Sequence, residues 1–252
     1  DIDPAQTDDD YPSKQFNVAT WTGNGTNDTA ISLGMQPDLV VIKERGSANN
    51  WYWIDSTRGV TNTLQTNSNA STHTESGVLN AFTSTGFTIG TSGGSNNNSD
   101  TYVGYGWRAN GGTTSTNSEG DADSTVQANT AAGFSIVQFP NYSGDTKFGH
   151  GLTKAPNFII AKLTASGSNY PTYHDGYSSG KCCFANLSNA EANSTHFAHS
   201  GTGNPVSATT FGMGASFAGS GAGIAWCWHD VEGYSKFGSY EGNNNTDGPF
   251  VY

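Results

Sequence analysis

Charged side chains are scarce in this sequence of 252 residues. Asp, Glu, Lys and Arg together make up 12% of it, roughly half the share of an average globular domain. Its polarity comes instead from Asn, Ser, Thr and Gly, which favour turns and helix caps over helix interiors. Strong helix formers such as Leu, Glu, Lys and Met are few, and no segment shows sustained helical periodicity. These absences exclude a mainly helical fold and favour an all-β protein with many turns.

Basic residues are the scarcer charged kind, with 10 Lys and Arg against 21 Asp and Glu, and the formal net charge is −11. Such an acidic surface repels phosphate, so we expect no nucleic-acid partner. Long apolar runs are absent as well, and we expect no membrane insertion. The opening stretch DIDPAQTDDDYPSK has neither the basic nor the apolar region of a signal peptide.

Cysteine is rare too, since only Cys182, Cys183 and Cys227 occur. An odd number of cysteines in a chain of this length is not a disulfide framework, and adjacent thiols on a strand face opposite sides. The nearest metal-like pattern, Asp121-x-Asp123, lacks the later bidentate Glu of a calcium loop. We therefore predict neither a metal site nor a cofactor.

What the chain does contain is one pattern of strands and turns written twice. The matched segments are FNVATWTGNG (16–25) with FSIVQFPNYSG (134–144), LGMQPDLVVIK (33–43) with HGLTKAPNFIIAK (150–162), and YVGYGWRA (102–109) with GIAWCWHDV (223–231). Each proline is followed by a short β-rich apolar run, as in a strand buried on both faces. The distance along the sequence from Pro37 to Pro156 is nearly the same as that from Trp107 to Trp228. This constant spacing indicates an internal duplication.

The duplication predicts an all-β chain of tandem β-sandwiches. The expected parts are an acidic leader (1–15), sandwich repeat 1 (16–112), a Gly/Ser/Thr linker (113–133), sandwich repeat 2 (134–232), and the start of a third repeat or a closing hairpin (233–252). Sandwiches joined by such a linker would form an extended array. If the last part is ordered, we expect Phe237, Tyr240 and Phe250 to be buried, because a lone hairpin is only marginally stable.

Five motifs follow one another within 16–109: FNVATWTGNG, LGMQPDLVVIK, IDSTRG, STGFTIG and YVGYGWRA. This set resembles an uncharacterised repeat domain of tail-fibre and virion proteins of bacteriophages, marine ones especially; residues 134–230 match it more loosely. The resemblance implies a concanavalin-like jelly roll of the lectin or glucanase type, a place in the virion and synthesis in the host cytoplasm. It also implies other virion proteins as partners and a homo-oligomer, but it supplies no catalytic or binding residues.

Carboxylates suited to glycan cleavage are missing at the expected spacing. Retaining jelly-roll glucanases carry Glu-x-Asp-x-x-Glu on one strand, so that acid and nucleophile flank one glycosidic bond. The nearest cluster here, Glu119-Gly-Asp121-Ala-Asp123, lies in the expected linker. We therefore expect no catalytic residues and no enzyme activity, with a glycan hydrolase or lyase as the least favoured function.

Aromatic and polar side chains gather at corresponding places in the two copies of the repeat. The alignment of the copies pairs Asp55 with Asp175. Aromatic faces stack on sugar rings, while Asp, Asn and Arg bond the hydroxyls. The candidate ligand-binding residues are Trp51, Tyr52, Asp55 and Arg58 in the first copy and Tyr170, Tyr173, His174 and Asp175 in the second. The alternative is that these side chains only pack at strand ends. Because strand neighbours point to opposite faces, His174 and Asp175 are not expected to pair.

These observations favour a non-enzymatic phage structural protein with lectin-like modules. Its expected role is weak, multivalent adhesion to host-surface glycans, since linked modules gain avidity. The alternative is a purely structural module that decorates or spaces the capsid, and that binds only other virion proteins through exposed apolar surface.

Overall fold

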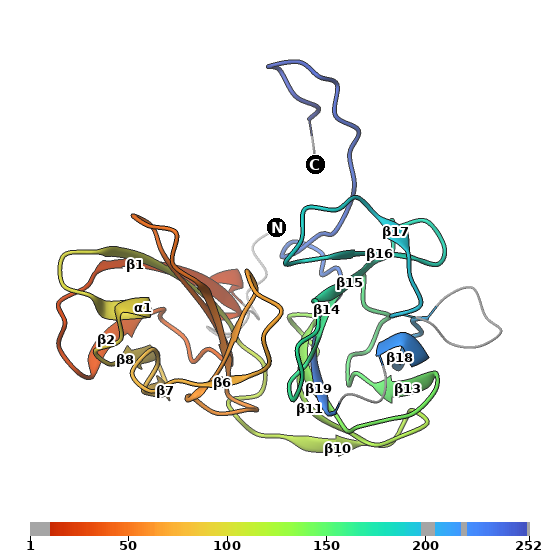
Figure 1. The fold of residues 1–252 in the computed structure, drawn as a ribbon, viewed down its shortest axis with the longest axis horizontal. Coiled ribbons are helices and arrows are strands. Elements are labelled where there is room, and N and C mark those ends of the chain that lie inside the picture. The colour runs from red at the N-terminus through yellow and green to blue at the C-terminus, as the bar shows by residue number, and fades with distance from the viewer. Residues whose placement is uncertain (1–10, 198–204, 218–220, 251–252) are drawn as a thin grey trace, which may run out of the picture.

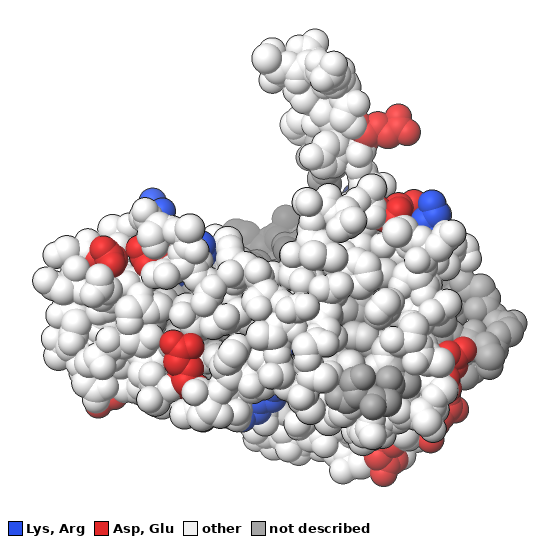
Figure 2. Space-filling view, viewed as in Figure 1, with Lys and Arg blue, Asp and Glu red and all other residues white. Residues whose placement is uncertain are grey.

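The computed structural model describes residues 11–197, 205–217 and 221–250, so residues 1–10 of the expected leader and residues 251–252 of the expected C-terminal part lie outside it. The predicted all-β class is confirmed, because the described strands form antiparallel sheets. Helical structure in the described residues is limited to η2 (Pro12–Lys14), α1 (Gly93–Asn96) and η3 (Ala215–Phe217). Figure 1 shows two groups of strands side by side, and Figure 2 shows few charged side chains on the same face.

The first half consists of a large and a small sheet. The large sheet runs in the order β1 (Phe16–Thr22), β9 (Thr101–Trp107), β3 (Leu39–Glu44), β4 (Trp51–Asp55), β5 (Asn62–Gln65) and β6 (His73–Thr74), and the small one β2 (Thr29–Ser32), β8 (Gly86–Ile89) and β7 (Ala81–Thr83). Buried side chains that include Ile42, Phe87 and Tyr102 form the core of this half. The two sheets thus pack as a β-sandwich.

Strand β3 is buried on both faces. Val40 and Ile42 belong to the core of the first half, whereas Leu39 and Val41 belong to a second core on the opposite face of the sheet. A strand between two cores needs apolar side chains at every position. The continuous apolar run after Pro37 therefore has the burial that the sequence predicted.

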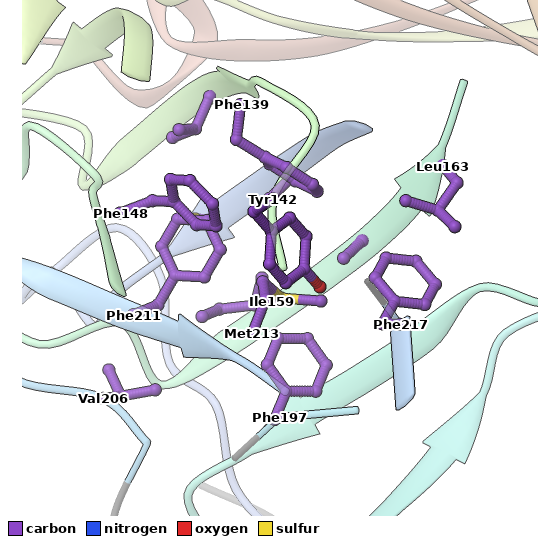
Figure 3. Close-up of a cluster of buried hydrophobic side chains, with 14 of the residues drawn as sticks. Phe139, Tyr142, Phe148, Ile159, Leu163, Phe197, Val206, Phe211, Met213 and Phe217 are labelled. Atoms are coloured by element: carbon purple, nitrogen blue, oxygen red, sulfur yellow. The ribbon is translucent and has the colours of Figure 1, made fainter. Parts of the chain in front are cut away.

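The second half has the same plan. Its large sheet runs β10 (Ser115–Asn117), β11 (Ser124–Asn129), β12 (Phe134–Phe139), β19 (Gly223–Trp228), β14 (Phe158–Leu163), β15 (Pro171–His174), β16 (Lys181–Phe184) and β17 (Ala192–Asn193), and the small one β13 (Thr146–Gly149) and β18 (Thr210–Met213). Its core is aromatic: Phe139 lies 5.0 Å from Phe148 and 6.3 Å from Phe211 between ring centres (Figure 3).

The six repeated strands follow the same order in both large sheets. This order is β1-β9-β3-β4-β5-β6 in the first and β12-β19-β14-β15-β16-β17 in the second. Their registers agree as well, because Phe16 pairs with Trp107 just as Phe134 pairs with Trp228. The segments that the sequence matched therefore occupy equivalent positions in the two sheets.

One position of the alignment is wrong. Leu39 pairs with Asp55, whereas its counterpart Phe158 pairs with His174. Asp55 therefore corresponds to His174, not to Asp175. The physical reason is that β15 ends at His174, so Asp175 already belongs to the turn that follows.

The two halves pack directly on each other. Between them lies a third core, in which Trp53 of β4 is 4.9 Å from Trp226 of β19, and Trp107 is 6.2 Å from Trp228, between ring centres. The sheets are stacked as small, large, large and small layers (Figure 1). The extended array is therefore wrong for these two repeats, because removing so much aromatic surface from water stabilises the compact arrangement.

The segment expected to be a linker, 113–133, is also structured. It contains β10 and β11, and β11 pairs with β12 at the edge of the second large sheet. Gln127 of β11 is fully buried, and its amide donates to the hydroxyls of Ser56 and Thr57 in the first half. The polar side chains that suggested a linker thus satisfy buried groups between the halves.

The expected third repeat or closing hairpin is absent, since residues 233–250 contain no strand. Of the three aromatics expected to be buried, Phe237 packs on the body, with its ring stacked 5.7 Å from that of Phe158. Tyr240 and Phe250 are 69% and 80% exposed, and the segment leads away from both halves in Figure 1. Near the start of this stretch, Ser235 forms an isolated β-bridge with Val231 that does not extend into a strand.

Candidate ligand-binding pocket

The structure does not bring the first predicted set of residues together. Trp51 and Tyr52 are neighbours on β4 and face opposite sides of the sheet. Trp51 is 37% exposed, whereas Tyr52 is 7% exposed and packs in the core of the first half. Asp55 and Arg58 lie at the other end of the strand and are buried. No common surface therefore presents these four side chains to one ligand.

Asp55 and Arg58 form a buried ion pair that closes the turn after β4. One carboxylate oxygen of Asp55 accepts from Arg58 Nε at 2.7 Å and lies 2.6 Å from Nη2, while the other accepts from the Arg58 backbone N–H at 2.9 Å. The guanidinium also lies 5.9 Å from the centre of the Trp226 ring, across the contact between the halves. This geometry stabilises the turn and its packing, and it leaves neither charge at the surface.

Tyr170, from the second predicted set, is a core residue. It is fully buried between the halves, and burial raises the pKa of its phenol. The Lys162 amino group lies 5.5 Å from the centre of its ring. Tyr170 thus packs at a strand end, which was the alternative interpretation of these candidates.

Tyr173, His174 and Asp175 do meet, in a pocket of about 190 Å³. The rest of its wall is made of Tyr177, Ser178, Ser179, Gly180, Lys181, Phe197 and Pro205. Most of these residues lie between the end of β15 and the start of β16, and we call the site the 173–181 pocket. Pockets for drug-sized ligands are larger, about 300–1,000 Å³, so this one suits a single ring or a small end group.

Aromatic side chains form one side of the 173–181 pocket. The Tyr177 ring lies 5.6 Å from the His174 ring, and the Tyr173 ring lies 6.0 Å from that of Phe197. The Tyr177 hydroxyl is held 3.2 Å from the hydroxyl of Thr172, and burial raises its pKa. These contacts fix the rings in place before any ligand arrives.

His174 and Asp175 lie in contact, contrary to the sequence prediction. His174 Nδ1 is 3.1 Å from an Asp175 carboxylate oxygen, because Asp175 has left the strand and its side chain turns back. However, the backbone N–H of Gly176 donates to the same Nδ1 at 2.8 Å. A nitrogen that accepts this bond cannot also donate a proton to the carboxylate, so the two side chains do not form a catalytic dyad.

Polar groups form the other side of the pocket. The Ser178 hydroxyl donates to Glu191 at 2.8 Å, and Lys181 Nζ lies 3.6 Å from the same carboxylate. Hydrogen bonds from Ser178, and to a lesser extent the charge of Lys181, lower the pKa of Glu191. Asp175, whose side chain is 45% exposed, accepts from the Asn157 amide at 2.7 Å. Asp175 is thus held in the pocket wall with oxygens left to accept further bonds, whereas Glu191 bonds Ser178 but does not line the pocket.

Sequence reasoning missed part of this pocket. Tyr177 and Ser178 follow Asp175 after a single glycine, so the whole turn belongs to the pocket. Lys181, at the start of β16, carried no such signal in the sequence.

Within the residues that the structure describes, no group of three or more His, Cys, Asp or Glu side chains is arranged to hold a metal ion. No helix in this part of the chain is long and apolar enough to cross a membrane.

The fold defines a protein of two fused β-sandwiches, with a small aromatic and polar pocket in the second. The chain belongs to a family described as a domain of unknown function (DUF7483), whose model matches residues 11–252 and so spans both halves. Comparison with curated proteins found no match, and neither did comparison with solved structures.

Proposed function

We propose that this chain is a non-enzymatic binding module of a bacteriophage virion, and that it adheres weakly to host-surface glycans through the 173–181 pocket. The observation that carries the proposal is the meeting of Tyr173 and Tyr177 with Asp175, Ser178 and Lys181 around one small pocket. Aromatic rings beside groups that bond hydroxyls are the combination with which proteins hold sugars.

The place in a virion rests on the resemblance of residues 16–109 to the phage repeat domain. Further copies of the chain and other virion proteins would then be its partners. A pocket of about 190 Å³ makes few contacts, so each copy would bind weakly. Many copies on one particle would supply the avidity that a single pocket lacks.

A role in binding rather than catalysis agrees with the hydrogen bonds in the pocket. His174 Nδ1 accepts from Gly176, so it does not pass a proton to Asp175. The low charge of the visible surface also suits recognition of neutral hydroxyl groups (Figure 2).

The proposal is tested on a panel of host-surface glycans presented to protein displayed in many copies. Tyr177→Ala should weaken binding about threefold to tenfold, because an aromatic contact contributes roughly that much. Asp175→Asn should also weaken it while preserving the shape of the turn. Trp51→Ala is the control, since it removes an exposed aromatic of the first half that lies away from the turn equivalent to the pocket. Binding that depends on Trp51 and not on Tyr177, or no binding to any glycan, would contradict the proposal.

A purely structural role is the second candidate, and the C-terminal segment favours it. Tyr240 and Phe250 are 69% and 80% exposed, and large exposed aromatics are typical of contact surfaces. If they mediate assembly, light scattering should show concentration-dependent association that Tyr240→Ser with Phe250→Ser abolishes. A chain that stays monomeric at all concentrations would rule this role out.

A further inference from the structure

A second and larger pocket lies between the two halves. Its volume is about 370 Å³, and it is lined by Thr57, Arg58, Asn62 and Thr72 from the first half and by Gln138, Thr164 and Ala165 from the second. All of these side chains except that of Ala165 are polar, none is a carboxylate, and Arg58 is the one cation among them. We call it the inter-half pocket.

Several buried hydrogen-bond donors at or near Arg58, which lines this pocket, lack an acceptor. Arg58 Nη1, Trp53 Nε1 and Trp226 Nε1 are buried and without a partner in the part of the chain that the structure describes. They lie together, since Trp226 is 4.9 Å from Trp53 between ring centres and its ring is 5.9 Å from the guanidinium. Guanidinium and indole groups can only donate. The hydroxyl of Thr72, which lines the pocket, is buried and unpartnered as well.

Two cations and two carboxylates are buried near the contact between the halves, namely Arg58, Lys162, Asp55 and Asp38. Arg58 is paired with Asp55 at 2.6 Å. Lys162, in contrast, is fully buried, and its amino group donates to two backbone oxygens and the hydroxyl of Ser168, not to a carboxylate. Burial, and then the positive charge of Arg58, lower the pKa of Lys162 to about 8, so its ammonium form still predominates at neutral pH. The acceptors around this ammonium group are all neutral, which favours an anion nearby.

We infer that the inter-half pocket binds a small carboxylate, as carried by an acidic sugar or by a free carboxylic acid. The hydroxyl of Thr72 and the amide of Gln138 line it from opposite halves and can both donate to such a group, with Arg58 beside them. A ligand held by both halves would also stabilise their association. This site is separate from the 173–181 pocket and does not depend on the function proposed for it.

The test uses glucuronate, with glucose as the neutral counterpart of similar ring and acetate as the smallest carboxylate. Each is titrated into the whole chain by calorimetry, and its effect on the melting temperature is measured. Glucuronate should bind once per chain and raise the melting temperature, and glucose should not bind at this site. Acetate binding would show that the carboxylate suffices, whereas binding of glucuronate alone would show that the sugar ring is needed; both results support the inference.

Two substitutions of Gln138 make the test specific. Gln138→Leu removes the amide donor and should weaken glucuronate binding at least about tenfold. This is the loss expected when one hydrogen bond to a charged group is removed. Gln138→Glu places a carboxylate in the pocket and should abolish binding by repulsion. Tyr177→Ala, in the other pocket, should leave it unchanged.

Three results would overturn the inference: no binding of either acid, equal binding of glucose and glucuronate, or glucuronate binding that survives Gln138→Glu and disappears with Tyr177→Ala. The last result would place the acid in the 173–181 pocket. It would therefore support the proposed glycan site while removing the second one, so the two proposals can fail separately.

Discussion

Lys43 and Lys162 hold the same position in the two halves, at the end of the buried run after each proline. Both amino groups donate to the backbone of the turn that follows. Lys43 is only half-buried, whereas Lys162 is fully buried. The same contrast holds beside them, where Trp51 is 37% exposed and its counterpart Tyr170 is completely buried.

The difference shows that the repeated sequence determines local hydrogen bonds, while packing between the halves determines burial. The turns after β4 and β15 diverge for a related reason. In the first half, Arg58 folds back on Asp55 and closes the turn. In the second half, the turn holds Tyr177 and Ser178 and leaves a pocket open. The two equivalent turns of the duplicated fold have thus taken different forms, an ion pair in the first half and a pocket in the second.

The largest expected effect concerns the aromatic contact between the halves. Trp226→Ala should cost about 3–5 kcal/mol of the free energy of unfolding, because it opens a cavity against Trp53. Trp51→Ala, at an exposed position, should cost less than about 1 kcal/mol. Urea titrations followed by fluorescence measure both. Equal losses would mean that the contact between the halves contributes little.

The buried ion pair comes next. Asp55→Ala leaves Arg58 buried without its counter-ion and should cost about 3 kcal/mol. Asp175→Ala removes a carboxylate that is 45% exposed, so it should lower the free energy of unfolding by less than about 1 kcal/mol. The same urea titration compares the two variants. A mild effect of Asp55→Ala would show that the pair is dispensable.

Much of the fold could be predicted from the sequence, because strand periodicity and the repeated prolines and tryptophans are local signals. The stacking of the layers could not be predicted, because Trp53 and Trp226 belong to different sheets and their contact exists only in the assembled fold. The linker was misjudged for the same reason: the polar side chain of Gln127 becomes buried only against Ser56 and Thr57.

The candidate site was predicted in part. Tyr173, His174 and Asp175 line a pocket, as the sequence predicts. The prediction that His174 and Asp175 do not meet is wrong, because the alternation of side chains along a strand does not extend to Asp175, which lies beyond the end of β15. Tyr170 carried no signal for its burial, because the first half supplies its surroundings.

Acid should weaken the second half through His150. This histidine is fully buried, accepts from the Leu152 backbone N–H through Nδ1, and has a pKa lowered by burial from 6.5 to about 4. The folded state therefore favours the neutral ring. The contribution of neutral His150 to the free energy of unfolding is complete above pH 6.5. It is lost as the pH falls towards 4, and the loss reaches about 3 kcal/mol.

His150→Gln should remove this part of the pH dependence and leave the rest. The comparison is the slope of unfolding free energy against pH for the two proteins between pH 6.5 and 4. His73, the histidine of the first half, is exposed, so His73→Gln is the control. Identical slopes for wild type and His150→Gln would contradict the prediction.

The smallest effects concern the two lysines. Lys162→Met should change the unfolding free energy by less than about 1 kcal/mol or increase it, because apolar replacement of a buried charge is often neutral or stabilising. Lys43→Met should cost a similar small amount or nothing, since Lys43 is partly solvated. Thermal melts of both variants measure this. A large loss for Lys162→Met would show that its hydrogen bonds outweigh the cost of burying its charge.

The number of neutral glycans bound per chain tests the account most directly. The glycan selected by the panel would be titrated into wild type, Tyr177→Ala, Trp51→Ala and Gln138→Glu by calorimetry. We expect one site per chain, strongly weakened by Tyr177→Ala and unchanged by the other two substitutions. Two sites per chain, or a single site indifferent to Tyr177→Ala, would contradict the proposal that the chain binds glycans through the 173–181 pocket of the second half.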